Sequence, residues 1–120
     1  WEPAAKKIKK EDTGEEWSLA LVRNPDIVAG IGQRRPPRLR ALVGFAAETE
    51  DLAANAQRKL RAKRLDLIVA NDVSAEDAGF EVDTNRVTLF DAAGEAEQLP
   101  LLSKDEVARR VMARVCRMLA

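Results

Sequence analysis

Two continuous apolar runs stand out in the middle of the chain, at residues 41–47 and 65–70. Apolar runs that do not alternate with polar residues are typical of parallel strands that are covered on both faces. The pattern therefore predicts a buried strand at each run. The second strand is expected to end at Asn71 and Asp72.

Between these runs, Leu52, Ala56 and Leu60 recur every four residues, which predicts a helix with one buried face. Thr49 is its expected N-cap, with acidic residues 50–51 in the first turn and basic residues in the last turns. A strand, a helix and a second strand form a right-handed βαβ unit, which needs a sheet with helices packed on it. The fold class predicted by the pattern is α/β.

Weaker patterns predict two elements before this unit. Residues 17–22 have the composition of a short strand. Asn24 is expected to cap the helix that follows, with Pro25 in its first turn and Asp26 placed favourably for the helix dipole. Residues 34–37, two arginines followed by two prolines, should end this helix because proline cannot continue it.

After the central unit, residues 87–90 and 97–99 flank Ala93 and Gly94, which predicts a β-hairpin. Ser103 and Glu106 have the spacing of a capping box. They predict a terminal helix whose buried positions recur along one face. These positions are Val107, Val111, Val115 and Leu119.

The composition narrows the chemistry that these residues can perform. The 120 residues include 20 basic and 20 acidic side chains, no histidine and one cysteine, Cys116. The chain itself therefore supplies no Ser-His-Asp triad, no His-ligated zinc site and no internal disulfide. No apolar run approaches the roughly 20 residues of a transmembrane helix, so we expect no membrane contact. Net neutrality also argues against a general polyanion binder.

The ends of the two predicted strands are the first candidate sites, because ligands of open α/β sheets bind where strands end. Phe45 offers a flat face to a nucleobase, and Gly44 allows close approach. The alternative is that Phe45 is ordinary core and Gly44 a packing residue. Asn71 and Asp72 are equally compatible with a loop that satisfies its own backbone.

Basic residues give three further candidates. Lys59 and Lys63 lie four positions apart on one helix face, within reach of one polyphosphate, or form a solvated face that complements the helix dipole. The lysine-rich segment that begins at Lys7 either closes over an anionic substrate or is a self-neutralising loop. A non-catalytic nucleotide- or RNA-binding module would use four arginines around the proline pair. These are Arg34, Arg35, Arg38 and Arg40.

Five motifs occur in a fixed order along the chain. They are Lys-Ile-Lys-Lys (7–10), Asn-Pro-Asp-Ile-Val (24–28), Val-Gly-Phe-Ala-Ala-Glu-Thr (43–49), Asp-Leu-Ile-Val-Ala-Asn-Asp-Val-Ser (66–74) and Asp-Thr-Asn-Arg-Val-Thr-Leu (83–89). Together they resemble the C-terminal half of bacterial phosphopantothenate–cysteine ligase, a domain that most bacteria fuse behind an FMN-dependent phosphopantothenoylcysteine decarboxylase.

This resemblance implies a Rossmann-like three-layer α/β domain that acts as a cytoplasmic homodimer in coenzyme A biosynthesis, with no nucleic-acid partner. Such enzymes use CTP and Mg²⁺ to convert the carboxylate of 4′-phosphopantothenate to an acyl-cytidylate, and release pyrophosphate. L-cysteine then displaces CMP. The resemblance also implies an incomplete domain, inactive alone, with a flexible strap at residues 1–16 and the C-terminal part of the ligase domain at residues 17–120. A chain that starts at Trp1 agrees with this expectation.

Residue roles follow from the same resemblance. Lys7 belongs to the strap, contacts CTP and serves the chemical steps. The stretch Pro25, Asp26, Ile27 and Val28 lines the nucleotide pocket, and Phe45 lies against the nucleotide. Lys59 and Lys63 match the lysine pair that contacts CTP. No metal ligand is assigned.

Overall fold

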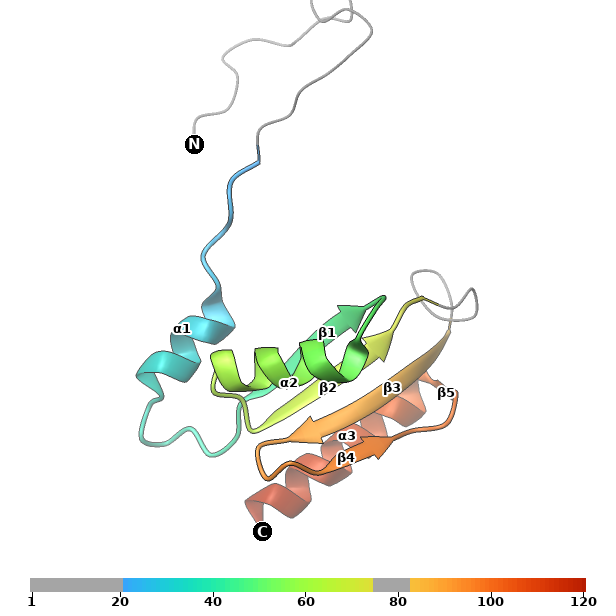
Figure 1. Cartoon of the computed structure of the whole chain (residues 1–120). Coiled ribbons are helices and arrows are strands. Elements are labelled where there is room, and N and C mark those ends of the chain that lie inside the picture. Colours follow the sequence, from blue (N-terminus) through green and yellow to red (C-terminus); the bar gives the residue numbers. More distant parts are fainter. Residues whose placement is uncertain (1–20, 75–82) are drawn as a thin grey trace, which may run out of the picture.

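The computed structural model describes residues 21–74 and 83–120, which form one sheet with helices on both faces (Figure 1). The predicted strap and Lys7 lie outside these residues. The helices are α1 (Ile27–Arg34), α2 (Leu52–Ala62) and α3 (Lys104–Leu119). The strands are β1 (Val43–Glu48), β2 (Leu67–Asp72), β3 (Thr84–Asp91), β4 (Ala96–Gln98) and β5 (Leu102–Ser103).

The sheet is mixed. Strands β1 and β2 pair in parallel, whereas β3 pairs antiparallel with β2, β4 and β5. Its order is β1-β2-β3-β4, with β5 beside β3. The predicted βαβ unit and the hairpin are therefore confirmed, and the short strand β5 is an addition that no sequence pattern indicated.

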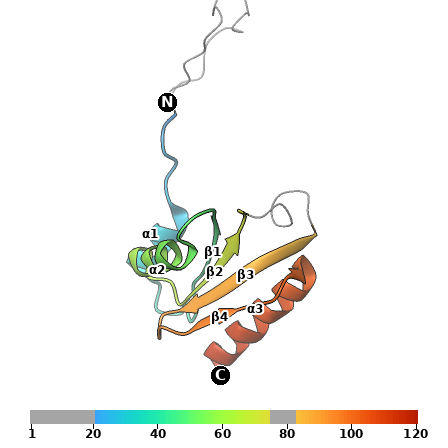
Figure 2. The same ribbon diagram turned by 45° about the vertical axis from the view of Figure 1, so that its right-hand side comes forward.

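Strand β2 separates two hydrophobic cores. Ile68 and Ala70 point to the side of α2, while Leu67 and Val69 point to the side of α3. Because successive side chains of a strand face opposite ways, an apolar run such as residues 67–70 of β2 has to be covered on both faces. Figure 2 shows the result, with α1 and α2 on one side of the sheet and α3 on the other. The predicted α/β architecture with flanking helices is confirmed.

Strand β1 differs from the prediction, because only one of its faces is buried. Gly44 and Glu48 are buried on the α2 side, but Phe45 on the opposite face is 75% exposed. The reason is the path of α3, which packs against β3 and β5, so that on this face of β1 Val43 packs into the core while Phe45 stays exposed. An apolar run could not reveal how far a helix distant in sequence extends across the sheet.

Helix α1 begins later than predicted. Asp26, not Asn24, is its N-cap, and the Asp26 carboxylate accepts a hydrogen bond from the Ala29 N–H at 2.9 Å. Asn24 and Pro25 both precede the helix. Two good N-cap residues flank Pro25, so the sequence pattern left two possible starts, and the second one is used. Its predicted end is confirmed, because the helix stops at Arg34.

Helix α2 also begins later than predicted. Asp51 is its N-cap, in the left-handed region with φ 46°, and its side chain caps no N–H. Thr49 therefore lies outside the helix. Instead, the Asn55 side-chain amide donates to the Glu50 carbonyl at 2.9 Å, which holds the chain that enters α2. The predicted buried face is confirmed, with Ala56 and Leu60 in the core.

The last helix follows the prediction. Ser103 is the N-cap of α3, and its hydroxyl accepts the Glu106 N–H at 3.2 Å. Val107 and Val111 are buried against the sheet. No membrane-crossing helix is present among the described residues, since none is both long and apolar enough.

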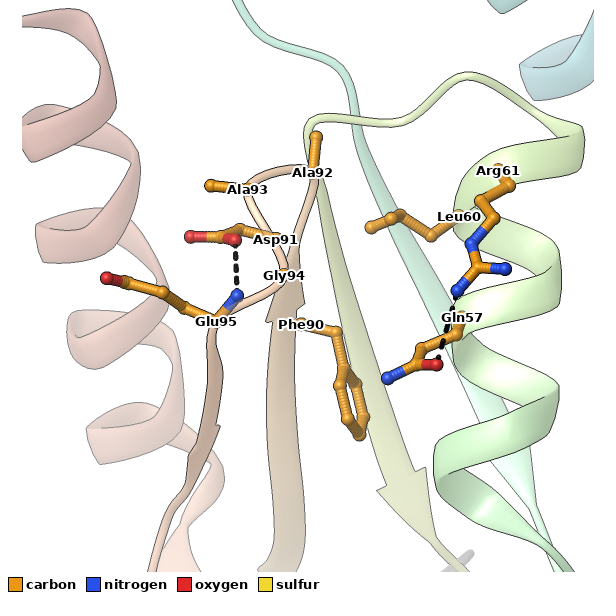
Figure 3. A pocket seen from close by; sticks show the side chains of 9 residues that line it. All are labelled: Gln57, Leu60, Arg61, Phe90, Asp91, Ala92, Ala93, Gly94 and Glu95. Atoms are coloured by element: carbon orange, nitrogen blue, oxygen red, sulfur yellow. Dashed lines mark hydrogen bonds between the residues drawn. The ribbon is translucent and has the colours of Figure 1, made fainter.

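One ion-pair cluster fastens α3 to the β3–β4 turn. Arg114 on α3 donates to the carboxylates of Asp91 and Glu95, and Asp91 also accepts the Glu95 N–H at 2.9 Å (Figure 3). Partial burial works to raise the pKa of Asp91, but the Glu95 N–H and the Arg114 guanidinium outweigh it and hold the pKa below its ordinary value. The same two carboxylates raise the pKa of Arg114.

This cluster predicts an acid-sensitive contact. Because the folded-state pKa of Asp91 is lowered, its stabilisation is complete above the unfolded pKa of about 3.9 and is lost as the pH falls below that value. We expect Asp91→Asn to lower the free energy of unfolding at pH 6 and to reduce its decline towards pH 3. Urea unfolding at both pH values measures this. The exposed Asp105→Asn on α3 is the control, and an equal decline in Asp91→Asn and the native chain would contradict the prediction.

Candidate functional site

Four of the residues predicted to bind a nucleotide line one small hollow between α1, α2 and β1. Val28 comes from α1, Phe45 from β1, and Lys59 and Lys63 from the C-terminal end of α2. The hollow measures about 50 Å³, and Leu65 and Ile68 complete its apolar floor. We call it the lysine hollow. Residues far apart in the sequence thus meet at one place.

An ion pair connects the start of α1, just before Val28, to this hollow. Asp26 caps α1 with one carboxylate oxygen and pairs with Lys63 Nζ through the other, at 2.9 Å. The Ala29 N–H and then the Lys63 ammonium lower the pKa of Asp26. Asp26 therefore stays ionised at neutral pH and holds Lys63 at the mouth of the hollow. Pro25 and Ile27 are exposed beside it.

Lys59 is held by a different carboxylate. Its Nζ lies 2.6 Å from Glu48 Oε1, and Glu48 is only 8% exposed at the carboxyl end of β1. A buried carboxylate needs such a partner, because an unpaired charge in the interior is costly. Glu48 was not predicted as a site residue. The sequence did contain a signal for Glu48. Gly44, Ala46 and Glu48 share the inward-facing positions of β1, where a charged residue is unusual.

Neither ion pair closes the lysines to a ligand. The side chains of Lys59 and Lys63 remain 37% and 32% exposed. An ammonium group carries three donor hydrogens, so one bond to a carboxylate leaves two for a phosphate oxygen. Both lysines are thus positioned by carboxylates from other elements, and their contact with a nucleotide stays a prediction.

Phe45 and Gly44 each had two interpretations, a role at a ligand site or a role in packing. Phe45 is not core, since it is 75% exposed, and it is one of the residues that line the lysine hollow. Gly44 is a packing residue, because a Cβ atom there would lie 2.6 Å from Leu65 Cδ1. Phe45 also lines a second hollow of about 260 Å³ on the α3 side of the sheet, together with Asn71 and Asn85. Asn71 lies at a strand end that is one of the candidate ligand sites, whereas Asn85 was not singled out by the sequence.

The remaining candidates do not gather at this site. Arg35 donates to the Asp66 carboxylate at 2.5 Å, and Arg40 donates to the Leu119 carbonyl, so two of the four arginines proposed for RNA binding serve internal contacts. The hollow in Figure 3 lies on the other flank of α2, beside the β3–β4 turn, and none of the residues predicted to bind a nucleotide lines it. Among residues 21–74 and 83–120, no three potential metal ligands cluster.

Comparisons with known proteins bear on this geometry. A family model described as the DNA/pantothenate metabolism flavoprotein C-terminal domain matches residues 1–119. The chain belongs to this family. It is 46% identical over 109 residues to the coenzyme A biosynthesis bifunctional protein CoaBC of Bacillus subtilis (strain 168), a match that covers 91% of this chain and 26% of that protein.

Two solved structures agree. The crystal structure of the C-terminal domain of a coenzyme A biosynthesis bifunctional protein CoaBC matches with a TM-score of 0.68 at 42% identity, over 82% of this chain and 46% of that one. The DNA/pantothenate metabolism flavoprotein from Streptococcus pneumoniae, with a TM-score of 0.69 at 23% identity over 92% of this chain and 45% of that one, shows the same fold. The chain spans about a quarter of the Bacillus protein and under half of the solved domain.

The packing of α1 on α2 predicts opposite effects for two glycines of α1. A Cβ at Gly32 would lie 1.9 Å from the Lys63 carbonyl oxygen, whereas one at Gly30 would meet only the end of the Arg34 side chain at 3.4 Å. We expect Gly32→Ala to destabilise the fold by about 1–3 kcal/mol, as overpacking does. Gly30→Ala should be neutral or stabilising by up to about 1 kcal/mol. Chemical unfolding of both variants measures this, and equal stabilities would contradict the close approach.

The two lysines should differ in their contribution to stability. Lys59→Met leaves the buried Glu48 carboxylate unpaired and should cost about 1–3 kcal/mol. Lys63→Met frees only the exposed Asp26 carboxylate and should cost less than Lys59→Met. Adding Glu48→Gln to Lys59→Met should restore part of the loss, which a double-mutant cycle of unfolding free energies measures. Additive effects would show that Lys59 does not stabilise Glu48.

Proposed function

We propose that the chain supplies the C-terminal part of a CTP-dependent phosphopantothenate–cysteine ligase that works in coenzyme A biosynthesis. Residues 17–120 would form this part, and residues 1–16 the strap that carries Lys7. Family membership supports the pathway, because relatives that share over 40% identity are named for coenzyme A biosynthesis. The observation that supports a nucleotide substrate is the lysine hollow. There, two ammonium groups that are held by carboxylates lie beside the start of α1.

The proposed reaction needs charge stabilisation and alignment more than a protein nucleophile. A carboxylate oxygen of 4′-phosphopantothenate attacks the α-phosphorus of CTP, and pyrophosphate leaves. The amine of L-cysteine then attacks the acyl carbon of this mixed anhydride, and CMP leaves. Lysines that hold the triphosphate neutralise charge that grows on the departing pyrophosphate. This chemistry agrees with a chain that contains no histidine.

Each residue near the hollow has a proposed task. Lys59 and Lys63 contact the phosphates of CTP, while Glu48 and Asp26 fix the positions of the two ammonium groups. The exposed ring of Phe45 lies against the nucleotide, and the stretch Pro25–Val28 borders it. The roles of these residues, and that of Lys7, stay predictions.

The remaining parts of the proposal rest on the resemblance. The described residues form no carboxylate cluster suited to Mg²⁺, so we assign the ion no protein ligand here. FMN would belong to the decarboxylase portion of a bifunctional protein and not to this domain. The rest of the ligase domain, a homodimeric state and a cytoplasmic location also stay predictions.

The test uses the full-length ligase polypeptide that carries this chain. We expect pyrophosphate release to require 4′-phosphopantothenate and to prefer CTP over ATP. Lys63→Met should raise the KM for CTP by about 10- to 150-fold, corresponding to about 1.5–3 kcal/mol for a hydrogen bond to a charged group. Arg61→Met is the matched control, because Arg61 lines the hollow on the opposite flank of α2, where its side chain donates to Gln57. A preference for ATP, or an unchanged KM for CTP in Lys63→Met, would contradict the proposal.

A further inference from the structure

Helix α1 buries little of its own surface. Gly32 is its only buried residue, and Val28 is half-buried against the core. The apolar side chains of Ile27 and Ile31 are exposed. None of the other described helices or strands packs extensively against α1. Because burial of an apolar face is what mainly fixes a helix in place, polar contacts have to determine where α1 lies.

One such contact joins the C-terminal end of α1 to the loop between α2 and β2. Arg35, the C-cap residue, donates through Nη2 to the Asp66 carboxylate at 2.5 Å and through Nη1 to the Arg64 carbonyl at 3.2 Å. The same oxygen of Asp66 accepts the Leu42 N–H at 2.6 Å, so Asp66 is itself anchored to the segment before β1. A planar guanidinium that makes two hydrogen bonds fixes direction as well as distance. We call these contacts the Arg35 bridge.

The loop that this bridge holds begins at a lysine of the proposed nucleotide site. Lys63 directly precedes Arg64 in the chain. The Lys63 carbonyl faces Gly32 of α1, and its ammonium pairs with Asp26 at the start of α1 at 2.9 Å. Figure 1 shows α1 beside the C-terminal end of α2, where these contacts lie. Since a short helix moves as one body, loss of the contact at Arg35 should also shift Asp26.

We propose that Arg35 and Asp66 are positioning residues for the nucleotide, an inference that rests on the proposed function. Neither would touch CTP, since neither lines the lysine hollow. The Arg35 bridge sets the position of α1, and α1 carries Asp26, which holds the Lys63 ammonium at the mouth of the hollow. A displacement of about 1 Å in such a group is enough to lose much of its contribution.

A second arginine bridge separates positioning from general stabilisation. Arg114 holds the carboxylates of Asp91 and Glu95 at the β3–β4 turn (Figure 3). It lies on α3, on the opposite side of the sheet from α1 (Figure 2). Arg114 and Asp91 are less exposed than Arg35 and Asp66, so this bridge should stabilise the fold at least as much. An effect of stability alone would follow the loss of either bridge, whereas positioning of the nucleotide depends only on the Arg35 bridge.

The experiment compares Arg35→Met with Arg114→Met in the full-length ligase. We expect Arg35→Met to raise the KM for CTP by about 2- to 12-fold, the range for one hydrogen bond, and to leave kcat and the KM for 4′-phosphopantothenate unchanged. Arg35→Lys keeps the charge but loses the planar two-bond geometry, so its KM for CTP should lie between those of Arg35→Met and the native protein. Arg114→Met should lower the thermal midpoint at least as much as Arg35→Met and change neither KM.

A double-variant cycle tests whether the effect passes through Lys63. If it does, Arg35→Met should add little to the raised KM for CTP of Lys63→Met, because the group that the bridge positions is already absent. Two independent effects would multiply. Multiplied effects, an unchanged KM for CTP in Arg35→Met, or an equal rise in Arg114→Met would each overturn the proposal.

Hydrogen exchange measures the attachment of α1 without nucleotide or catalysis. In Arg35→Met, the amides of residues 27–34 should exchange faster than in the native protein, while those of α3 should not. Arg114→Met should give the reverse pattern. Unchanged exchange in α1 would also overturn the inference. Faster exchange in α1 together with a lack of CTP-dependent pyrophosphate release would refute the proposed function and support the attachment of α1 through Arg35.

Discussion

The burial of β2 on both faces is the constraint on which the rest of the structure depends. Leu67, Ile68, Val69 and Ala70 are each at most 2% exposed, and they point alternately to the two sides of the sheet. Two helical layers are needed to remove this surface from water, since the hydrophobic effect scales with the buried apolar area. Helix α2 supplies one layer and α3 the other. The βαβ connection then places the C-terminal end of α2, with its lysines, beside the edge strand β1.

A group of polar contacts around Asp66 supports the same region. Asp66, just before β2, accepts hydrogen bonds from the Leu42 N–H at 2.6 Å and from Arg35, which also donates to the Arg64 carbonyl at 3.2 Å. These contacts tie the segment between α1 and β1 to the start of β2. They fix α1 against the end of α2, where Gly32 permits contact with the Lys63 carbonyl. The arginine and proline segment, which could have been a nucleic-acid patch, thereby positions the helix start that borders the lysine hollow.

Much of the architecture was predictable because it follows from local periodicity. The parallel strands, the buried face of α2, the hairpin and the Ser103 cap all depend on residues within a few positions of one another. The incorrect expectations concern choices between equivalent local options. Asn24 and Asp26 were both suitable caps, and so were Thr49 and Asp51 by residue type, of which Asp51 is used with a left-handed backbone. The exposure of Phe45 depended on the reach of α3 and was not predictable from β1 itself.

The sequence by itself determined the family, through five motifs in a fixed order, and it predicted which residues bind a nucleotide. Only the tertiary structure decided which charges meet. Glu48 reaches Lys59, and Asp26 reaches Lys63, because the parallel register of β1 and β2 and the packing of α1 on α2 bring these pairs within hydrogen-bond distance. Such partnerships follow from strand register and helix position, which result from the burial of the whole core and are not encoded in any local segment.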